Sequence, residues 1–248
     1  MTRRDSELMN ERARQTAASS VARKLCGGRV SRCEIVNGVV CPNGENVNGC
    51  GSAAIHGWPD FSNAVIDNCL IMSNKCLSTG SNTGFAGACE VGSTAKYIMI
   101  YINCTIADNL GSSGGWSGCV RIPPNAGRPE QQVVNCVLFN NGGTADTEWY
   151  GSKSAVSRFK YCASTVQIAG GANCSVVPAA VRKVFAYGGE RPFEPAVRSA
   201  LRKAGSVPLY EQYSVSEKDV YGRKRVAKDT IDIGCAERLS TGMAVLLY

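Results

Sequence analysis

One short pattern returns along this chain at nearly constant spacing: a cysteine set between apolar residues, with an asparagine five positions later. It reads NCLIMSN around Cys69, NCTIADN around Cys104 and NCVLFNN around Cys136, and a weaker copy, RCEIVNG, surrounds Cys33. These cysteines are 36, 35 and 32 residues apart, and a fifth, degenerate copy surrounds Cys162. A repeat of this length indicates structural units that stack on one another.

Each unit reads as short strands. Apolar residues alternate through the repeat, which predicts that Val65, Asp67, Cys69 and Ile71 share one face of a strand. Stretches rich in glycine and serine separate the copies, as expected for turns between short strands. Short strands that restart every 30-odd residues predict one domain type, an all-β parallel β-solenoid.

Two columns of side chains follow from this fold. Residues of one type recur above one another on successive turns of a solenoid, about 4.8 Å apart. Cysteine packs there as a small apolar residue, and asparagine is expected at the corner, with a left-handed backbone and stacked amides. Gly38 takes the corner position in the first copy. The predicted columns are Cys33, Cys69, Cys104 and Cys136, and Asn74, Asn109 and Asn141.

Thirteen cysteines allow other interpretations. The tightest spacing is seven residues, from Cys26 to Cys33 and from Cys69 to Cys76, so no CxxC metal site is predicted. Disulfides between neighbouring turns of the solenoid stay open, because their Cα atoms lie at a bridgeable distance. Buried thiols are the favoured interpretation of the column.

The net charge of +7 is concentrated at the ends of the chain. Residues 1–32 carry 8 basic and 3 acidic side chains, residues 33–162 carry 7 and 9, and residues 163–248 carry 12 and 8. Because the repeats are almost neutral, nucleic acid is not an expected partner. No apolar stretch is long enough for a transmembrane helix, and the start of the chain lacks the apolar core of a secretion signal.

The sequence after the repeats carries a resemblance to a known family. The repeat with its glycine-rich turns resembles right-handed parallel β-helix proteins of bacterial surfaces, including those with polymorphic outer-membrane-protein repeats. The stretches RPFEPAVRSALRKAG, DVYGRKRVAKDT and IDIGCAE resemble, in order, the end of secreted β-helix proteins of the choice-of-anchor Q type. The resemblance implies a right-handed parallel β-helix that is exported. Its matching positions are Ser199, Ala204, Gly205, Asp219, Gly222, Arg225, Asp232, Ile233, Gly234 and Glu237.

Three regions are therefore expected. Residues 1–25 form a helical or disordered segment, 26–170 the β-helix repeats, and 171–248 a C-terminal cap and tail that covers the last turn. Within the cap, 178–187 and 195–204 are predicted short helices. Six residues are assigned to turns and pairing in the cap, including an Arg225–Asp232 pair. They are Asp219, Gly222, Arg225, Asp232, Gly234 and Glu237.

The function predicted from these features is a secreted or cell-surface scaffold whose loops bind a polysaccharide or a surface protein. Its candidate binding residues are aromatic: Trp58, Trp116, Trp149 and Tyr150. The alternative is a fragment of a carbohydrate-active β-helix enzyme, either a polysaccharide lyase or a glycoside hydrolase. No paired carboxylates in register are found, and His56, the one histidine, is assigned to a loop. No catalytic residue, metal site or cofactor is predicted, and cleavage of glycosidic bonds is not expected.

Overall fold

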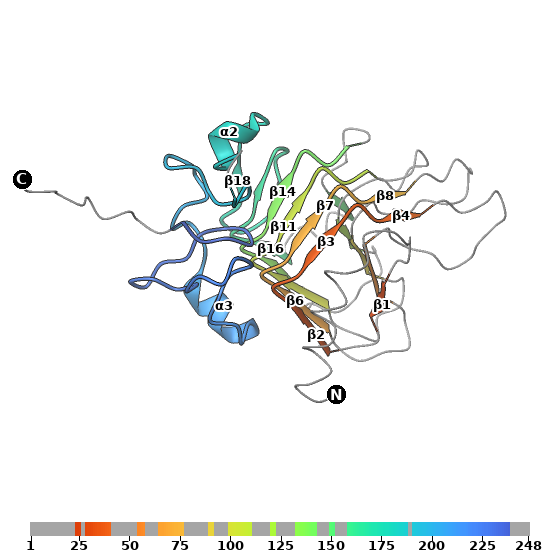
Figure 1. The fold of residues 1–248 in the computed structure, drawn as a ribbon, viewed down its shortest axis with the longest axis horizontal. Helices are drawn as coiled ribbons and strands as arrows, with labels where there is room; N and C mark the ends of the chain where they lie inside the picture. Colours follow the sequence, from red (N-terminus) through yellow and green to blue (C-terminus); the bar gives the residue numbers. More distant parts are fainter. Residues whose placement is uncertain are drawn as a thin grey trace, which may run out of the picture.

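The computed structural model describes residues 23–25, 28–40, 54–57, 64–76, 89–91, 99–110, 120–122, 132–142, 149–151, 158–187 and 190–238. They form a coil of short parallel strands with two short helices, which confirms the prediction of an all-β, solenoid-like fold (Figure 1). The paired strands run from Arg23 to Val176, against the expected 26–170. Residues 1–22, most of the predicted N-terminal segment, lie outside the described residues.

Three sheets make up the coil, and each turn of the chain, here called a rung, adds strands to them in order. The first sheet contains β1 (Arg23–Leu25), β5 (Ile55–Gly57), β9 (Cys89–Val91), β12 (Val120–Ile122) and β15 (Trp149–Gly151). The second contains β2 (Gly28–Ser31), β6 (Ala64–Asp67), β10 (Met99–Ile102), β13 (Gln132–Val134) and β16 (Phe159–Lys160). The third contains β3 (Glu34–Val36), β7 (Leu70–Met72), β11 (Thr105–Ala107), β14 (Val137–Phe139), β17 (Ala163–Ser164) and β18 (Ser175–Val176). A short fourth pair joins β4 (Val39–Val40) to β8 (Lys75–Cys76).

The corner between the second and third sheets is a single residue with a left-handed backbone, directly before each column cysteine. Its φ lies between 49° and 54° in every rung. This residue resets the alternation of side chains, so Ala64 and Ile66 face the interior before the corner and Cys69 and Ile71 face it afterwards. The prediction that Val65 and Asp67 share a face with Cys69 is therefore wrong. The corner residues are Arg32, Asn68, Asn103, Asn135, Tyr161 and Asn173.

The predicted asparagines form a buried chain of amide hydrogen bonds at the end of the third sheet. Asn74 Nδ2 donates to Asn109 Oδ1 at 2.9 Å, and Asn109 Nδ2 donates to Asn141 Oδ1 at 2.9 Å. The chain extends to the first rung, because the Gly38 backbone N–H donates to Asn74 Oδ1 at 2.9 Å. The prediction that these asparagines adopt a left-handed backbone is wrong. The residue before each position of the amide chain has the positive φ instead, namely Asn37, Ser73, Asp108 and Asn140.

The column cysteines stack along the axis of the coil, one per rung. The residue after each cysteine donates its backbone N–H to the carbonyl of the preceding column cysteine, at 2.9 Å in every case. The column is longer than predicted, since Cys162 and Cys174 extend it by two rungs. Among the cysteines whose side chains the structure describes, none forms a disulfide. The bonds run from Leu70 to Cys33, Thr105 to Cys69, Val137 to Cys104, Ala163 to Cys136 and Ser175 to Cys162.

The chain after the last rung, residues 177–238, is called the C-terminal segment below. Helix α2 (Val181–Val184) lies inside the predicted range 178–187, whereas 195–204 forms turns instead of the second predicted helix. A helix that was not predicted, α3 (Val207–Tyr213), follows. Ser206 caps it by accepting a hydrogen bond from the Leu209 backbone N–H, and Pro208 occupies its first turn, where a missing N–H costs nothing.

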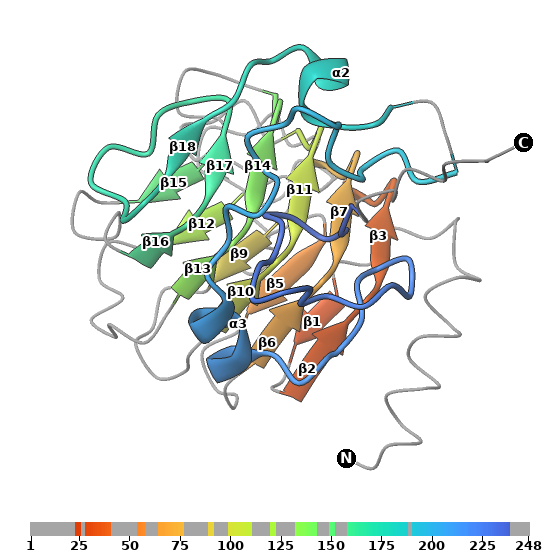
Figure 2. The same cartoon turned by 90° about the vertical axis from the view of Figure 1, so that its left-hand side faces the viewer.

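The C-terminal segment packs along the side of the coil. Phe185, Phe193, Leu201 and Ile233 pack on the outer face of the third sheet, and Tyr210 and Ile231 pack on that of the second. Figure 2 shows the segment crossing in front of these two sheets. Val176 in the last rung stays 58% exposed, so the described contacts of the segment do not bury this end of the coil as a cap would.

Hydrogen bonds attach the segment to the corner asparagines. Asn103 Nδ2 donates to the Asp232 carbonyl at 2.9 Å, and the Ser206 backbone N–H donates to Asn135 Oδ1 at 2.8 Å. The Gly234 backbone N–H donates to the Asn135 carbonyl at 2.9 Å. These bonds place the segment against the backbone of successive rungs, which leaves little space at the contact.

Gly234 is expected to tolerate no side chain. Its φ is +100°, and a Cβ atom there would lie 2.8 Å from Thr105 Oγ1 and 3.0 Å from Val137 Cγ2. Gly222 has a similar φ of +83° but no atom within 4 Å of such a Cβ. Both glycine-to-alanine changes strain the backbone, so only the clash distinguishes them. We expect Gly234→Ala to lower the free energy of unfolding by about 1–3 kcal/mol more than Gly222→Ala does, measured by urea denaturation. Equal losses would contradict this packing.

Candidate functional site

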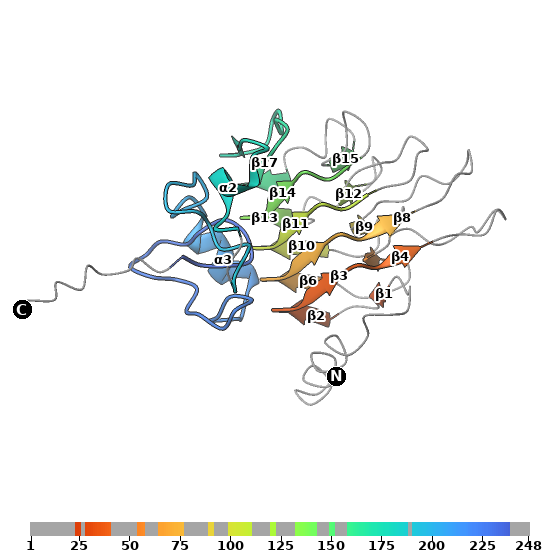
Figure 3. The same cartoon turned by 45° about the horizontal axis from the view of Figure 1, so that its top comes forward.

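The first sheet differs from the other two on its outer face. The described packing partners of the C-terminal segment come from the second and third sheets. Figure 3 shows α2 and α3 on one side of the coil and β1, β9, β12 and β15 on the other. The C-terminal segment packs on apolar residues at outer positions of these sheets, such as Val65, Ile102, Val137 and Phe139.

The middle residues of the strands in the first sheet form one row, called the polar row below. Strand pairing aligns them directly with one another from rung to rung. Neighbouring positions in such a row are about 4.8 Å apart. The polar row consists of Lys24, His56, Glu90, Arg121 and Tyr150.

The polar row lies on the face of the sheet opposite the interior. Ile55 and Cys89, the residues that precede His56 and Glu90, belong to the interior core with exposures of 1% and 0%. Trp149, which precedes Tyr150, packs against the same core. Successive residues of a strand lie on opposite faces, so the middle residues occupy the outer face.

The composition of the polar row suits an extended anionic or polyhydroxylated ligand. Lysine and arginine offer charged donors, and arginine also binds carboxylates with two parallel hydrogen bonds. Histidine and tyrosine donate or accept protons and hydrogen bonds, and glutamate accepts hydrogen bonds from hydroxyl groups.

The sequence interpretation missed this row. The intervals between its members are 32, 34, 31 and 29 residues, close to the repeat, but every member is a different residue type. No residue type therefore recurs in the sequence at this spacing, and only the register of the paired strands aligns the five positions. His56, assigned to a loop, is the middle residue of strand β5.

The predicted aromatic binding residues separate into three cases. Trp58 and Trp116 lie outside the described residues. Trp149 is a core contact, with its ring centroid 5.5 Å from that of Phe159, which contradicts its assignment to a binding loop. Tyr150 is in strand β15 and belongs to the polar row.

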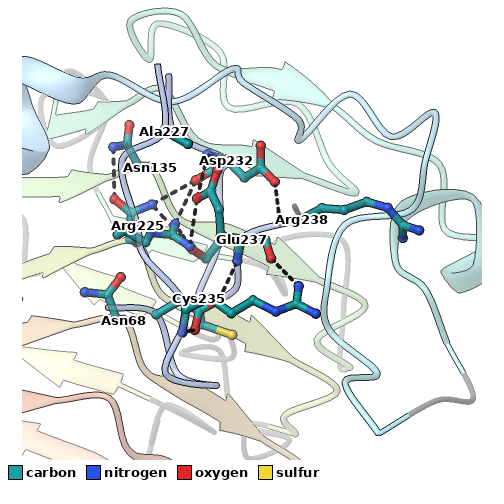
Figure 4. Close-up of polar contacts among 12 residues, drawn as sticks. Asn68, Asn135, Arg225, Ala227, Asp232, Cys235, Glu237 and Arg238 are labelled. Carbon is teal, nitrogen blue, oxygen red and sulfur yellow. Dashed lines mark hydrogen bonds and ion pairs between the residues drawn. The ribbon is translucent and has the colours of Figure 1, made fainter. Parts of the chain in front are cut away.

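The four charged residues assigned to the predicted cap, Asp219, Arg225, Asp232 and Glu237, are buried and belong to a polar network inside the C-terminal segment. Figure 4 shows Arg225, Asp232 and Glu237 within it. Asp219 Oδ1 accepts the Tyr221 and Arg223 backbone N–H groups at 2.9 and 2.8 Å and forms the turn that contains Gly222. Asp219 Oδ2 accepts the Glu237 backbone N–H at 2.8 Å. These bonds stabilise loops, so they give Asp219 a structural role.

Arg225 is fully buried in this network, but its partner differs from the prediction. Its guanidinium lies 3.5 Å from the Glu237 carboxylate and donates to the Asp232 carbonyl at 2.8 Å and to the Gly234 carbonyl. The Asp232 carboxylate instead accepts the Lys203 and Arg238 backbone N–H groups, at 2.7 and 2.8 Å. The predicted Arg225–Asp232 ion pair is therefore replaced by an Arg225–Glu237 pair.

Burial raises the pKa of the Glu237 carboxyl to about 8, although the Arg225 charge acts in the opposite direction. The folded state thus holds a proton that the unfolded state releases near pH 4.3. The contribution of protonated Glu237 to the free energy of unfolding is fully present at low pH and is lost as pH rises towards 8. We expect the free energy of unfolding to fall over this range, and Glu237→Gln to reduce the fall by at least about 1 kcal/mol.

Urea denaturation at several pH values measures this effect. Glu211→Gln makes the same change at an exposed position in α3 and serves as the control. A Glu237→Gln variant with the wild-type slope between pH 5 and about 8 would refute the protonation of buried Glu237.

Two further properties concern the described part of the chain. It contains no cluster of three or more histidine, cysteine, aspartate or glutamate side chains arranged to bind a metal ion. Neither of its helices has the length and apolar character needed to cross a lipid bilayer.

Comparisons of the chain with protein-family models, curated proteins and solved structures gave no match.

Proposed function

We propose that this chain is a secreted or cell-surface β-helix scaffold that binds an extended polysaccharide along the polar row of its first sheet. The observation that carries the proposal is the contrast between sheets. The C-terminal segment covers apolar residues at outer positions of the second and third sheets, whereas the register of the first sheet aligns five polar residues in five consecutive rungs.

The charge of the row favours an acidic polymer. Lys24 and Arg121 are cationic, Glu90 is anionic, and His56 and Tyr150 are neutral near pH 7 in ordinary surroundings. A uronate chain can pair its carboxylates with the two cations and its hydroxyl groups with the remaining members. Acidic polysaccharide is therefore the proposed ligand class.

The handedness and location of the coil belong to the same proposal. A right-handed coil is supported by the strong preference of connections between parallel strands for that hand. Export is supported by the resemblance of the last third of the chain to secreted β-helix proteins. The C-terminal segment then acts as a lateral brace that protects two sheets and leaves the third available to ligand.

A polysaccharide lyase remains the second candidate, because His56, Glu90 and Arg121 occupy neighbouring register positions. Elimination from a uronate needs a cation at the carboxylate and a group that moves the α-proton, and arginine with histidine or tyrosine provides both. Hydrolysis of a glycosidic bond needs two carboxyl groups across the bond. The polar row holds one, Glu90, so elimination fits this row better than hydrolysis.

One assay separates the two candidates. The purified chain is incubated with polygalacturonate, alginate and neutral dextran, with and without calcium, and both retention on the polymer and formation of unsaturated ends are measured. Retention on an acidic polymer without unsaturated ends supports the scaffold, whereas unsaturated ends that Arg121→Ala abolishes support the lyase. Equal retention on dextran, or on none of the three, would refute an acidic-polysaccharide site.

A further inference from the structure

The column of cysteines has one end with different surroundings from its interior. Cys69, Cys104, Cys136 and Cys162 are fully buried, with exposures of 0%. Cys174, in the last rung, is partly exposed. Of the four rung-to-rung contacts in this stretch of the column, only that between Cys162 and Cys174 joins a buried thiol to one that solvent reaches.

The backbone holds these two cysteines in direct register. The Ser175 backbone N–H donates to the Cys162 carbonyl at 2.9 Å, and Ala163 pairs with Ser175 in the parallel ladder. Paired Cα atoms in adjacent parallel strands are about 4.8 Å apart. Disulfides need a Cα separation of about 4.4–6.8 Å, so no rearrangement of the rungs is required to join these residues.

The two thiols also influence each other's titration. Interaction with the Cys162 side chain lowers the pKa of Cys174 to about 7. Burial raises the pKa of Cys162, Cys136 and Cys104, so these thiols stay protonated at neutral pH. Thiolates are the nucleophiles in disulfide exchange, and Cys174 alone in this set combines thiolate character with access.

We propose that Cys162 and Cys174 form a thiol–disulfide exchange site that accepts a low-molecular-weight disulfide as its oxidant. The site is independent of the polysaccharide surface, because it lies at the corner between the second and third sheets. It gives the chain a reversible covalent link between its last two rungs, at the end of the coil that the C-terminal segment leaves partly open.

The reaction with oxidised glutathione proceeds in two balanced steps. The Cys174 thiolate attacks one glutathione sulfur, forms a mixed disulfide and releases a glutathione thiolate. Cys162 then loses its proton to that thiolate or to water, and its sulfur attacks Cys174 Sγ and displaces the second glutathione. Two protein thiols are oxidised to one disulfide, and one oxidised glutathione is reduced to two thiols.

Tryptic peptide mapping measures the oxidation state of Cys162 and Cys174 separately from that of the other cysteines. Residues 161–182 form one fragment, between Lys160 and Lys183, and Cys162 and Cys174 are its two cysteines. Cys136 is the single cysteine of fragment 122–153 and provides the internal control. The folded full chain is equilibrated with mixtures of oxidised and reduced glutathione, alkylated after denaturation, and digested.

We expect fragment 161–182 to lose two hydrogen atoms and to escape alkylation as the proportion of oxidised glutathione rises, while Cys136 stays fully alkylated. Dithiothreitol should reverse the change. Cys162→Ser should trap glutathione on Cys174, and Cys174→Ser should leave Cys162 fully alkylated. The proposal fails if fragment 161–182 keeps both thiols, if Cys136 oxidises to the same extent, or if the Cys162→Ser variant takes up no glutathione.

Discussion

Replacing Arg225 by alanine is expected to lower the free energy of unfolding by about 3–5 kcal/mol at pH 8.5. Arg225 is fully buried, and its guanidinium is the cation beside the Glu237 carboxylate at 3.5 Å. Its removal leaves that carboxylate without a counter-charge and takes away one of the two donors to the Asp232 and Gly234 carbonyls, the other being Asn103 Nδ2. Breaking one side of a buried ion pair costs more than the pair itself contributes, because the remaining charge stays away from water.

Urea denaturation measures the loss, with Arg198→Ala as the matched control. Arg198 lies in the same segment but is exposed, so its replacement should change stability by no more than about 0.5 kcal/mol. The Arg225→Ala cost should also shrink when Glu237→Gln is added, since the stranded charge is then gone. Equal effects of Arg225→Ala and Arg198→Ala would contradict the buried network as the element that holds the segment together.

The second large effect is expected at Asn109, the middle residue of the amide chain. Its side chain donates to the Ile71 carbonyl and to Asn141 Oδ1, and it accepts from the Asn74 backbone N–H and from Asn74 Nδ2. Asn109→Ala leaves several of these buried groups unpaired, and each such group costs about 1–3 kcal/mol. We expect a loss of about 2–4 kcal/mol in the free energy of unfolding, because the rungs relax in part.

Asn140→Gly provides the control for this change. Asn140 is exposed and has a φ of 53°, a conformation that glycine adopts without strain, so its replacement should cost less than about 1 kcal/mol. Thermal unfolding followed by circular dichroism ranks the two variants. An Asn109→Ala variant as stable as Asn140→Gly would show that the amide chain does not stabilise the coil.

The repeat was predictable because each rung places the same residue types at the same structural positions. An interior cysteine and an asparagine of the amide chain recur at equivalent positions in successive rungs. Their spacing in the sequence therefore equals the length of one rung. The residue that precedes each column cysteine, an asparagine in four of the six rungs, adopts the left-handed conformation at the corner, which resets the side-chain alternation. A simple two-residue period cannot reveal that reset, which is why Val65 and Asp67 were assigned to the wrong face.

The position of the C-terminal segment could have been inferred from one overlooked signal. Strands β6, β10, β13 and β14 carry apolar residues on both faces, as Val65, Ile102 and Val134 show, and apolar residues on two faces need a cover on each. The polar row could not be inferred in this way. Its members share no residue type, so only the pairing of β1, β5, β9, β12 and β15 brings them together.

Paired arginine variants test whether the first sheet presents the ligand-binding face. Polygalacturonate oligosaccharides are titrated by calorimetry into the wild type, into Arg121→Ala in the polar row, and into Arg182→Ala on the exposed surface of α2. Loss of one charge-assisted contact to a carboxylate should weaken binding by about tenfold or more. We expect that loss for Arg121→Ala alone. Equal affinities of the two folded variants would refute a binding face on the first sheet.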